Sequence, residues 1–251
     1  MSSLSKIAIV TSHPIQYNAP LFKRLAGVSC IDLLVFYTWG KDGAGKKYDP
    51  DFNREISWDL PLLEGYDYRF CENTSKKPGS HYFNGIKTPN LIFQIEEWQP
   101  DIVWVWGWAF QSHLKVLRHF KGRSIVWFRG DSTLLDEPSG FSLKKLLRKV
   151  FLKWVYSHID KAFYVGANNR DYFLKFGLKE NQLVFAPHAV DNSRFETLTE
   201  YVNQNLKELR HSLDLTNDDY IILFAGKLEQ KKNPRFLLEF INSVSDKSIK
   251  L

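Results

Sequence analysis

Hydrophobic and polar positions follow two alternating patterns along the chain. Short apolar runs rich in Val, Ile, Phe and Trp end at polar residues, Gly or Pro, which is typical of strands buried on both faces of a parallel sheet. Longer stretches repeat apolar residues every three or four positions, which is typical of amphipathic helices. The patterns predict strands at 6–11, 31–37, 102–106, 124–128, 162–165, 183–186 and 220–225, and helices at 19–26, 88–98, 109–120, 142–157, 168–176, 200–213 and 233–242.

The order of these elements predicts an α/β fold. Strands and helices alternate, which favours a doubly wound parallel sheet with helices on both faces. One stretch, 38 to about 84, is irregular and rich in Gly, Pro, Asp and aromatic residues; loops of this length are usually functional or mobile. We interpret 187–191 as a crossover that separates a first domain, 1–190, from the beginning of a second, 191–251.

The segment around residue 226 has the features of an anion site. Gly226 ends the apolar run 220–225, a polar loop with lysines follows, and Asn233 precedes a proline at the expected start of a helix. Asn is a favoured N-cap residue and Pro a favoured first helical residue. The free N–H groups and the positive end of the helix dipole then favour an anion. Lys227 and Lys232 add positive charge at this place.

Composition narrows the class of protein. The 251 residues are 44% hydrophobic and 25% charged, which suits one large or two ordinary globular domains. A net charge of +6 favours an anionic partner, whether a phosphate-bearing ligand, an acidic membrane or nucleic acid. Cys30 and Cys71 lack metal or redox spacing, which favours a reduced cytoplasmic protein. We expect neither a signal peptide nor a membrane span, since every apolar run is too short.

Several motifs together resemble a known family. AGKLEQKKNP resembles the G-R-L-x-x-x-K-G loop of nucleotide-sugar glycosyltransferases with the GT-B fold, family 4, retaining. SHPIQYNAPLFKRLA, DLPLLEGYDY and FRGDSTLL resemble segments of a bacterial branch with an H-P-I-Q-Y signature, and PHAVDNSRF resembles the family's crossover. These segments are spread over residues 6–242. The resemblance implies a Rossmann-like first domain and the start of a second Rossmann-like domain.

The resemblance also implies a reaction and a donor site. The family transfers a sugar from a nucleoside-diphosphate donor to an acceptor hydroxyl with retention of configuration, commonly in cell-surface glycan or polysaccharide synthesis. Lys227 stands at the position of the family's Arg and Lys232 at that of its Lys, so both are expected to bind the donor diphosphate beside Gly226. Lys keeps the charge of Arg but loses its bidentate geometry. His188 and Asp191 lie in the crossover. The family implies no cofactor or metal, and the catalytic residues stay unassigned.

Loops that follow the predicted strands supply candidates for the acceptor site, because ligands of doubly wound sheets bind beyond the carboxyl ends of the strands. The candidates are His13, Gln16, Tyr17, Trp108, Arg129 and Asp131. Each group has a structural alternative. His13 is also compatible with a loop packed by Pro14 and Ile15, although the resemblance favours the site, and Trp108 is equally compatible with a place in the core. Arg129 and Asp131 are also compatible with an ion pair that stabilises a turn.

The helix expected at 142–157 has an apolar stripe and a basic face. The stripe consists of Leu143, Leu146, Leu147, Val150, Phe151 and Trp154, and the basic face of Lys144, Lys145, Arg148, Lys149 and Lys153. One interpretation is a surface that contacts anionic lipid at the inner face of a membrane. The other is a helix that packs its stripe on the sheet and leaves its lysines in solvent, and the surrounding alternation favours this for the stripe. The two interpretations are compatible.

Two features limit the glycosyltransferase hypothesis. The family's E-x7-E motif lies farther along the second domain, and this sequence ends at Leu251 without it. We therefore expect the chain to be inactive alone, as part of a longer enzyme or completed by another chain. The competing hypothesis is a non-catalytic module that binds an anionic glycan, a lipid or nucleic acid. Nucleic acid is disfavoured, because no RNA-binding signature is present. A dehydrogenase or P-loop kinase is disfavoured too, because GxGxxG and GxxxxGKS/T are absent.

Overall fold

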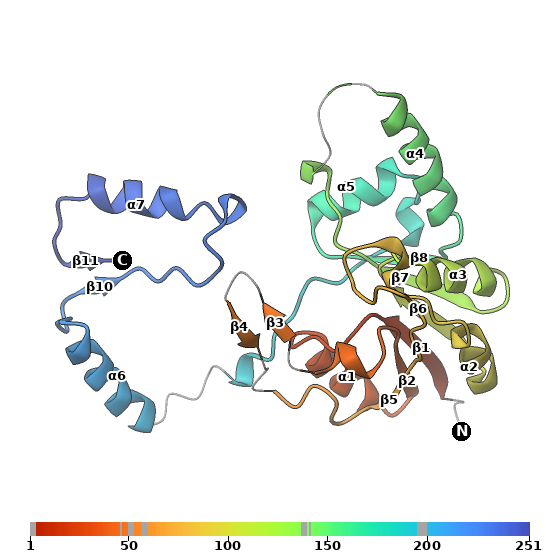
Figure 1. The fold of residues 1–251 in the computed structure, drawn as a ribbon, viewed down its shortest axis with the longest axis horizontal. Helices are drawn as coiled ribbons and strands as arrows, with labels where there is room; N and C mark the ends of the chain where they lie inside the picture. Colours follow the sequence, from red (N-terminus) through yellow and green to blue (C-terminus); the bar gives the residue numbers. More distant parts are fainter. Residues whose placement is uncertain are drawn as a thin grey trace. The chain divides into compact units, whose positions relative to one another are not determined.

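The computed structural model describes residues 4–45, 47–49, 53–56, 60–136, 140, 142–194 and 200–251. The chain forms two compact units. The first comprises Met1–Gly45 and Ser57–Val190, and the second comprises Lys46–Ile56 and Asp191–Leu251. Figure 1 shows their elements along the chain.

The first unit is built on a parallel sheet (Figure 1). Its strands are β1 (Ser5–Thr11), β2 (Ile31–Tyr37), β5 (Asp67–Phe70), β6 (Ile102–Trp106), β7 (Ile125–Arg129), β8 (Lys161–Tyr164) and β9 (Leu183–Phe185), in the order β5-β2-β1-β6-β7-β8-β9. The expected neighbours β1, β6 and β7 pair in parallel, with Ile9 opposite Trp104 and Trp104 opposite Trp127. The predicted doubly wound α/β fold is confirmed.

Helices cover both faces of this sheet. They are α1 (Ala19–Ala26), α2 (Leu91–Trp98), α3 (Gln111–Phe120), α4 (Leu143–Tyr156) and α5 (Ala167–Lys175). Because side chains alternate along a strand, Ile7 and Ile9 pack in the cluster that holds Phe22 of α1. Ala8 and Val10 pack on the other face, in the cluster to which α2, α3, α4 and α5 contribute.

The stretch 38–84 holds more structure than the sequence predicted. It contains β5, an edge strand of the main sheet, and a hairpin of β3 (Lys47–Asp49) with β4 (Arg54–Ile56). Our interpretation of an irregular segment was wrong for β5, because its residues, Asp67–Phe70, show little apolar character. An edge strand has only one neighbour and needs no continuous apolar run.

The described residues also form short 3-10 turns, which are η1 (Lys41–Gly43), η2 (Phe83–Gly85), η3 (Leu134–Asp136), η4 (Glu180–Gln182), η5 (Asn192–Arg194) and η6 (Gln230–Lys232).

The second unit contains a small β-α-β arrangement. This arrangement consists of β10 (Tyr220–Ile221), α7 (Pro234–Ser243) and β11 (Ile249–Lys250), and β10 pairs with β11 in parallel. Helix α6 (Glu200–Ser212) and the hairpin of β3 with β4 belong to the same unit. The prediction of a buried strand at 220–225 was wrong, because Tyr220 is 72% exposed and Leu223 is 81% exposed. The reason is that β10 has one short neighbour, so the described part of the unit offers too little surface to cover the run.

Helix α4 packs with the side opposite to the one we expected. Leu152, Val155 and Tyr156 are its buried residues. At 3.6 residues per turn, these three lie across the helix from the predicted stripe, whose members Leu143 and Val150 are 68% and 61% exposed. The helix has two apolar sides. The side with fewer apolar residues packs on the core, where Tyr156 contacts the rings of Phe128 and Phe173.

None of the described helices is both long enough and apolar enough to cross a membrane.

Candidate functional site

A pocket of about 190 Å³ opens at the point where the strand order reverses. The chain runs from β1 outward to β2 and β5 and returns to β6 on the other side of β1. Ligands of doubly wound sheets bind at such a point, beyond the carboxyl ends of the strands. The lining residues are Thr11, Ser12, Ile15, Tyr17, Asn18, Trp106, Gly107, Arg129, Gly130, Asp131, Val165 and His188. Four candidates from the sequence, Tyr17, Arg129, Asp131 and His188, therefore meet in one pocket.

Arg129 is the buried cation of this pocket. Its Nη1 donates to the carbonyl of Ala186 at 2.9 Å and its Nη2 to that of Pro187 at 3.4 Å. The guanidinium also lies 5.1 Å from the ring centroid of Trp106. Burial lowers the pKa of Arg129, and the nearby Asp131 and Tyr17 oppose this shift. A guanidinium stays protonated even so, so Arg129 fixes the segment after β9 and gives the pocket a positive charge.

Tyr17, His188 and Asp131 supply further polar groups. The rings of Tyr17 and His188 meet edge to face with centroids 5.7 Å apart. Burial raises the pKa of Tyr17, the charge of Asp131 raises it further, and Arg129 lowers it. The phenol is therefore protonated at neutral pH and acts as a donor. The exposed Asp131 acts as an acceptor for hydroxyl groups. A hydroxyl, a carboxylate, a guanidinium and aromatic edges together suit a polar, hydroxylated ligand.

Three of the candidates from the sequence, His13, Gln16 and Trp108, do not line this pocket. His13 packs edge to face on Trp39, with centroids 5.3 Å apart, and its Nδ1 lies 2.9 Å from Ser12 Oγ. Gln16 is half-buried beside the pocket but does not line it. Trp108 packs against the core, with its ring 5.6 Å from that of Phe151. Trp108 therefore belongs to the core, which is one of the two places that the sequence allowed for it.

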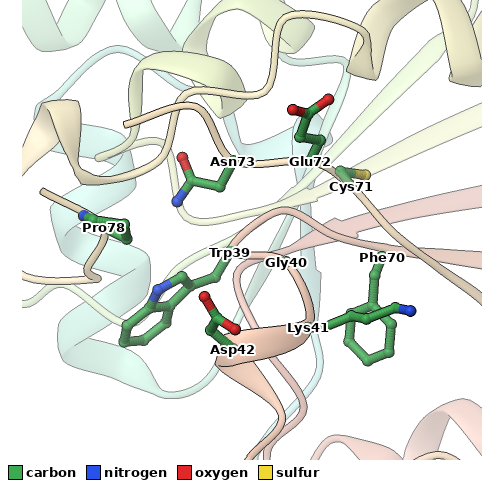
Figure 2. Close-up of a pocket in the computed structure, with 9 residues that line it drawn as sticks. All are labelled: Trp39, Gly40, Lys41, Asp42, Phe70, Cys71, Glu72, Asn73 and Pro78. Carbon is green, nitrogen blue, oxygen red and sulfur yellow. The ribbon is translucent and has the colours of Figure 1, made fainter. Parts of the chain in front are cut away.

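A second cavity, of about 310 Å³, follows β2 and β5. Figure 2 shows its lining side chains, which come from three stretches: Trp39, Gly40, Lys41 and Asp42; Phe70, Cys71, Glu72 and Asn73; and Pro78. Asn73 fixes the surrounding loop, since its amide donates to Gly85 and accepts from the N–H groups of Ser75 and Lys87. Sequence reasoning missed this cavity because it missed β5, whose last residue, Phe70, and the three residues after it line the wall.

His13 connects the two cavities. It contacts Ser12, which lines the pocket at the switch point, and Trp39, which lines the cavity after β2. The ring therefore contacts one lining residue of each cavity.

His113 is a buried support that sequence reasoning also missed. It is fully buried on α3, its Nδ1 lies 2.8 Å from the carbonyl of Gly107, and its Nε2 lies 2.8 Å from Thr38 Oγ1. Burial lowers the pKa of His113 to about 4, so the ring is neutral at pH 7. Nδ1 then donates to Gly107, which leaves Nε2 as an acceptor. The single proton of Thr38 Oγ1 is shared between this nitrogen and the carbonyl of Thr11, 3.1 Å away. The ring thereby joins the loops after β2 and β6, and a lone His on a helix gives no signal of this role.

The basic loop of the second unit lies between β10 and α7. Its end is the 3-10 turn η6, in which the N–H groups of Lys232 and Asn233 donate to Glu229 and Gln230, both at 3.0 Å. Asn233 is the residue before α7, as predicted, but it has φ 49° and its side chain makes no capping bond. Lys232 and Gly226 are exposed and Lys227 is half-buried. The N–H groups of Lys232 and Asn233 are therefore used within the turn itself.

Two further observations concern the crossover and metal ions. Asp191, which is exposed, accepts a hydrogen bond from Ser193 Oγ at 2.6 Å. In the part of the chain that the structure describes, no three His, Cys, Asp or Glu side chains form a group that could hold a metal ion.

The fold matches solved structures, although the sequence matches no family model and no curated protein. Anabaena HepE in complex with UDP superposes with a TM-score of 0.61 at 13% identity, over 98% of this chain and 59% of that one. HepE with UDP and glucose gives 0.59 over the same shares. A UDP-N-acetylglucosamine 2-epimerase gives 0.51 at 14% identity, over 99% of this chain and 68% of that one. The chain thus spans about 59% of the length of HepE, and it shares the Rossmann-like α/β fold of these solved structures.

Proposed function

We propose that this chain is part of a glycosyltransferase that moves a sugar from a nucleoside-diphosphate donor to an acceptor hydroxyl with retention of configuration, in the synthesis of a cell-surface glycan. The observation that carries the proposal is the fold shared, over 98% of the chain, with a protein solved in complex with UDP and glucose. The switch-point pocket supports it, because Tyr17 and Asp131 offer the donor and acceptor that sugar hydroxyls need.

In this proposal the two units have different tasks. The first unit holds the acceptor in the switch-point pocket, with Arg129 and His188 in its wall. The second unit binds the donor diphosphate through Lys227 and Lys232, whose charges stabilise the leaving group as its negative charge develops. No step of the proposed reaction is assigned to a metal or a cofactor.

Nucleotide titration of the lysine variants tests the donor side. UDP and GDP are titrated by calorimetry into the protein at its natural length and into Lys227→Ala, Lys232→Ala and Lys231→Ala. A charge-assisted contact to phosphate contributes about 1.5–3 kcal/mol, so losing Lys227 or Lys232 is expected to weaken binding about 10- to 150-fold. Lys231→Ala is the control, with the same loss of charge one position away. Equal binding by all four proteins would contradict the donor loop.

The shared fold with a UDP-N-acetylglucosamine 2-epimerase favours a second candidate function. The two are separated by supplying UDP-N-acetylglucosamine without an acceptor and analysing the sugar by NMR. Inversion at C2 would favour the epimerase, and transfer that requires an added acceptor would favour the glycosyltransferase. Binding of an anionic glycan or lipid with neither reaction would favour the non-catalytic module.

A further inference from the structure

Helix α4 exposes an apolar surface on the side away from the core. We call Leu143, Leu146, Leu147, Val150, Phe151 and Trp154 the α4 apolar surface. Leu143, Leu147 and Val150 are 68%, 63% and 61% exposed. Phe151 and Trp154 form the border and are about 40% exposed, because Phe151 packs on Trp108 and Arg118 lies over the ring of Trp154. Single exposed apolar side chains are ordinary, but a contiguous group marks an interaction site. The α4 apolar surface is therefore a candidate interaction site.

The charges beside this surface indicate the partner. Lys144, Lys149 and Lys153 are exposed, and the helix contains no Asp or Glu. Two other cations of α4 are engaged within the protein. Arg148 donates to Tyr172 Oη at 3.0 Å and lies over the ring of Phe176, and Lys145 donates through Nζ to the carbonyl of Gly140. The lysines left in solvent flank apolar residues, which is the pattern of a helix that lies in the interface of an anionic bilayer.

The position of α4 in the sheet places this surface near the pockets. The helix connects the carboxyl end of β7 to the amino end of β8, and these two strands are parallel. It must therefore run back along the sheet, with its N-terminal half at the carboxyl edge of the strands. Both cavities open at that edge, after β1, β6 and β7 and after β2 and β5. The two most exposed residues of the α4 apolar surface, Leu143 and Leu147, lie in this N-terminal half, and Val150 follows it directly.

We propose that the α4 apolar surface docks on an anionic lipid bilayer. Leu143, Leu147 and Val150 enter the boundary between headgroups and acyl chains, and Lys144, Lys149 and Lys153 lie at the level of the lipid phosphates. A second copy of the chain fits less well, because it would bring two sets of lysines together, and like charges across an interface are unfavourable. The inference goes beyond the proposed transferase activity and does not depend on it. The proposed binding differs from attraction by charge alone, because salt screens the charges but leaves the apolar contact in place.

Vesicle sedimentation tests the apolar part. The intact chain is sedimented with vesicles of 30% phosphatidylglycerol in phosphatidylcholine, and with phosphatidylcholine alone. Losing one inserted apolar side chain costs about 1.5 kcal/mol or more of burial, which is about ten-fold in partition coefficient. The double variant Leu147→Ser/Val150→Ser is therefore expected to bind the anionic vesicles about 100-fold more weakly. Its matched control is Phe93→Ser/Phe185→Ser, at positions 67% and 60% exposed outside α4, which is expected to bind like the wild type.

Charge reversal tests the basic part. Each lysine near an anionic surface contributes about five-fold to the partition coefficient, so Lys144→Glu/Lys149→Glu is expected to lose about 25-fold or more. The control Lys76→Glu/Lys247→Glu makes the same change of net charge at exposed positions elsewhere in the chain. At 0.5 M salt the wild type is expected to keep weak binding that Leu147→Ser/Val150→Ser lacks.

Several outcomes would overturn the inference. Equal sedimentation of the wild type and Leu147→Ser/Val150→Ser would show that the apolar surface does not contact lipid. Equal binding to neutral and anionic vesicles, or an equal loss in the Lys76→Glu/Lys247→Glu control, would remove the role of the α4 lysines. A dimer in sedimentation velocity that Leu147→Ser/Val150→Ser abolishes, without vesicle binding, would assign the surface to a second copy. Thermal unfolding serves as the folding control, and the exposed positions predict unchanged Tm.

Discussion

Strand β1 of the first unit and strand β10 of the second begin from similar apolar sequences, KIAIVT and YIILFA. In the first unit, β1 pairs with β2 on one side and β6 on the other, and Ile9 is completely buried. In the second unit, β10 pairs with β11 over two residues, and Tyr220 is 72% exposed. An apolar run therefore shows only that a segment can be buried. The neighbouring strands and helices decide whether burial occurs.

This contrast extends to the loops that follow the strands. The pocket of the first unit is held by side chains anchored in the core, such as Arg129 and His113. The lysine loop of the second unit follows a strand with little buried surface. Segments with few buried apolar contacts open locally at low free energy. We therefore expect the first unit to give most of the cooperative unfolding signal.

The largest expected effect comes from the same substitution made in each unit. Phe22 is completely buried on α1, whereas Phe236 on α7 is 58% exposed. Phe22→Ala leaves a cavity and is expected to lower the free energy of unfolding by about 3–5 kcal/mol. Phe236→Ala is expected to change it by less than about 1 kcal/mol. Urea unfolding followed by circular dichroism measures both, and equal losses would mean that α7 is buried as well as α1.

The second prediction concerns the pH dependence of the first unit. The pKa of His113 is about 4 in the folded chain, below its ordinary 6.5, because the ring is buried. Between these values the unfolded state binds more protons, so stability is complete above pH 6.5 and falls as pH drops toward 4. The loss is expected to reach about 3 kcal/mol.

Urea unfolding at pH 7, 5.5 and 4.5 measures this loss, and His113→Gln is the control. The variant lacks the titrating ring, so its stability is expected to fall less steeply over the same range, whatever its stability at pH 7. Parallel pH profiles for the two proteins would show that other groups cause the acid sensitivity.

The smallest effect on stability, and the sharpest local readout, comes from thiol reactivity. Burial raises the pKa of Cys71 to about 12, so its thiol is expected to react with a disulfide reagent much more slowly than a free cysteine while the first unit is folded. Leu223→Cys in a Cys30→Ser background places a thiol at a site 81% exposed in the second unit. This thiol is expected to react at the rate of a free cysteine in native conditions. A slow reaction there would mean that the second unit protects its apolar run.

The sequence by itself determined the architecture of the first unit and part of its site. The alternation of apolar runs with amphipathic stretches was sufficient for the parallel sheet, because every central strand is buried on both faces. The rule that ligands bind beyond the carboxyl ends of strands pointed to the loops of Tyr17, Arg129 and Asp131, which the structure brings together. These successes rest on local pattern and on general topology.

Only the tertiary structure decided which apolar surfaces are covered. Helix α4 has two apolar sides, and the contacts of Tyr156 with Phe128 and Phe173 select the side with fewer apolar residues. Strand β5 carries no strong pattern, so the cavity beside it appears only when β2 and β5 pair. His113 gains its role because Thr38 and Gly107, far from each other in the sequence, meet at its two nitrogens. Periodicity shows that a side of an element is apolar, but burial depends on residues distant in sequence, which a local pattern does not contain.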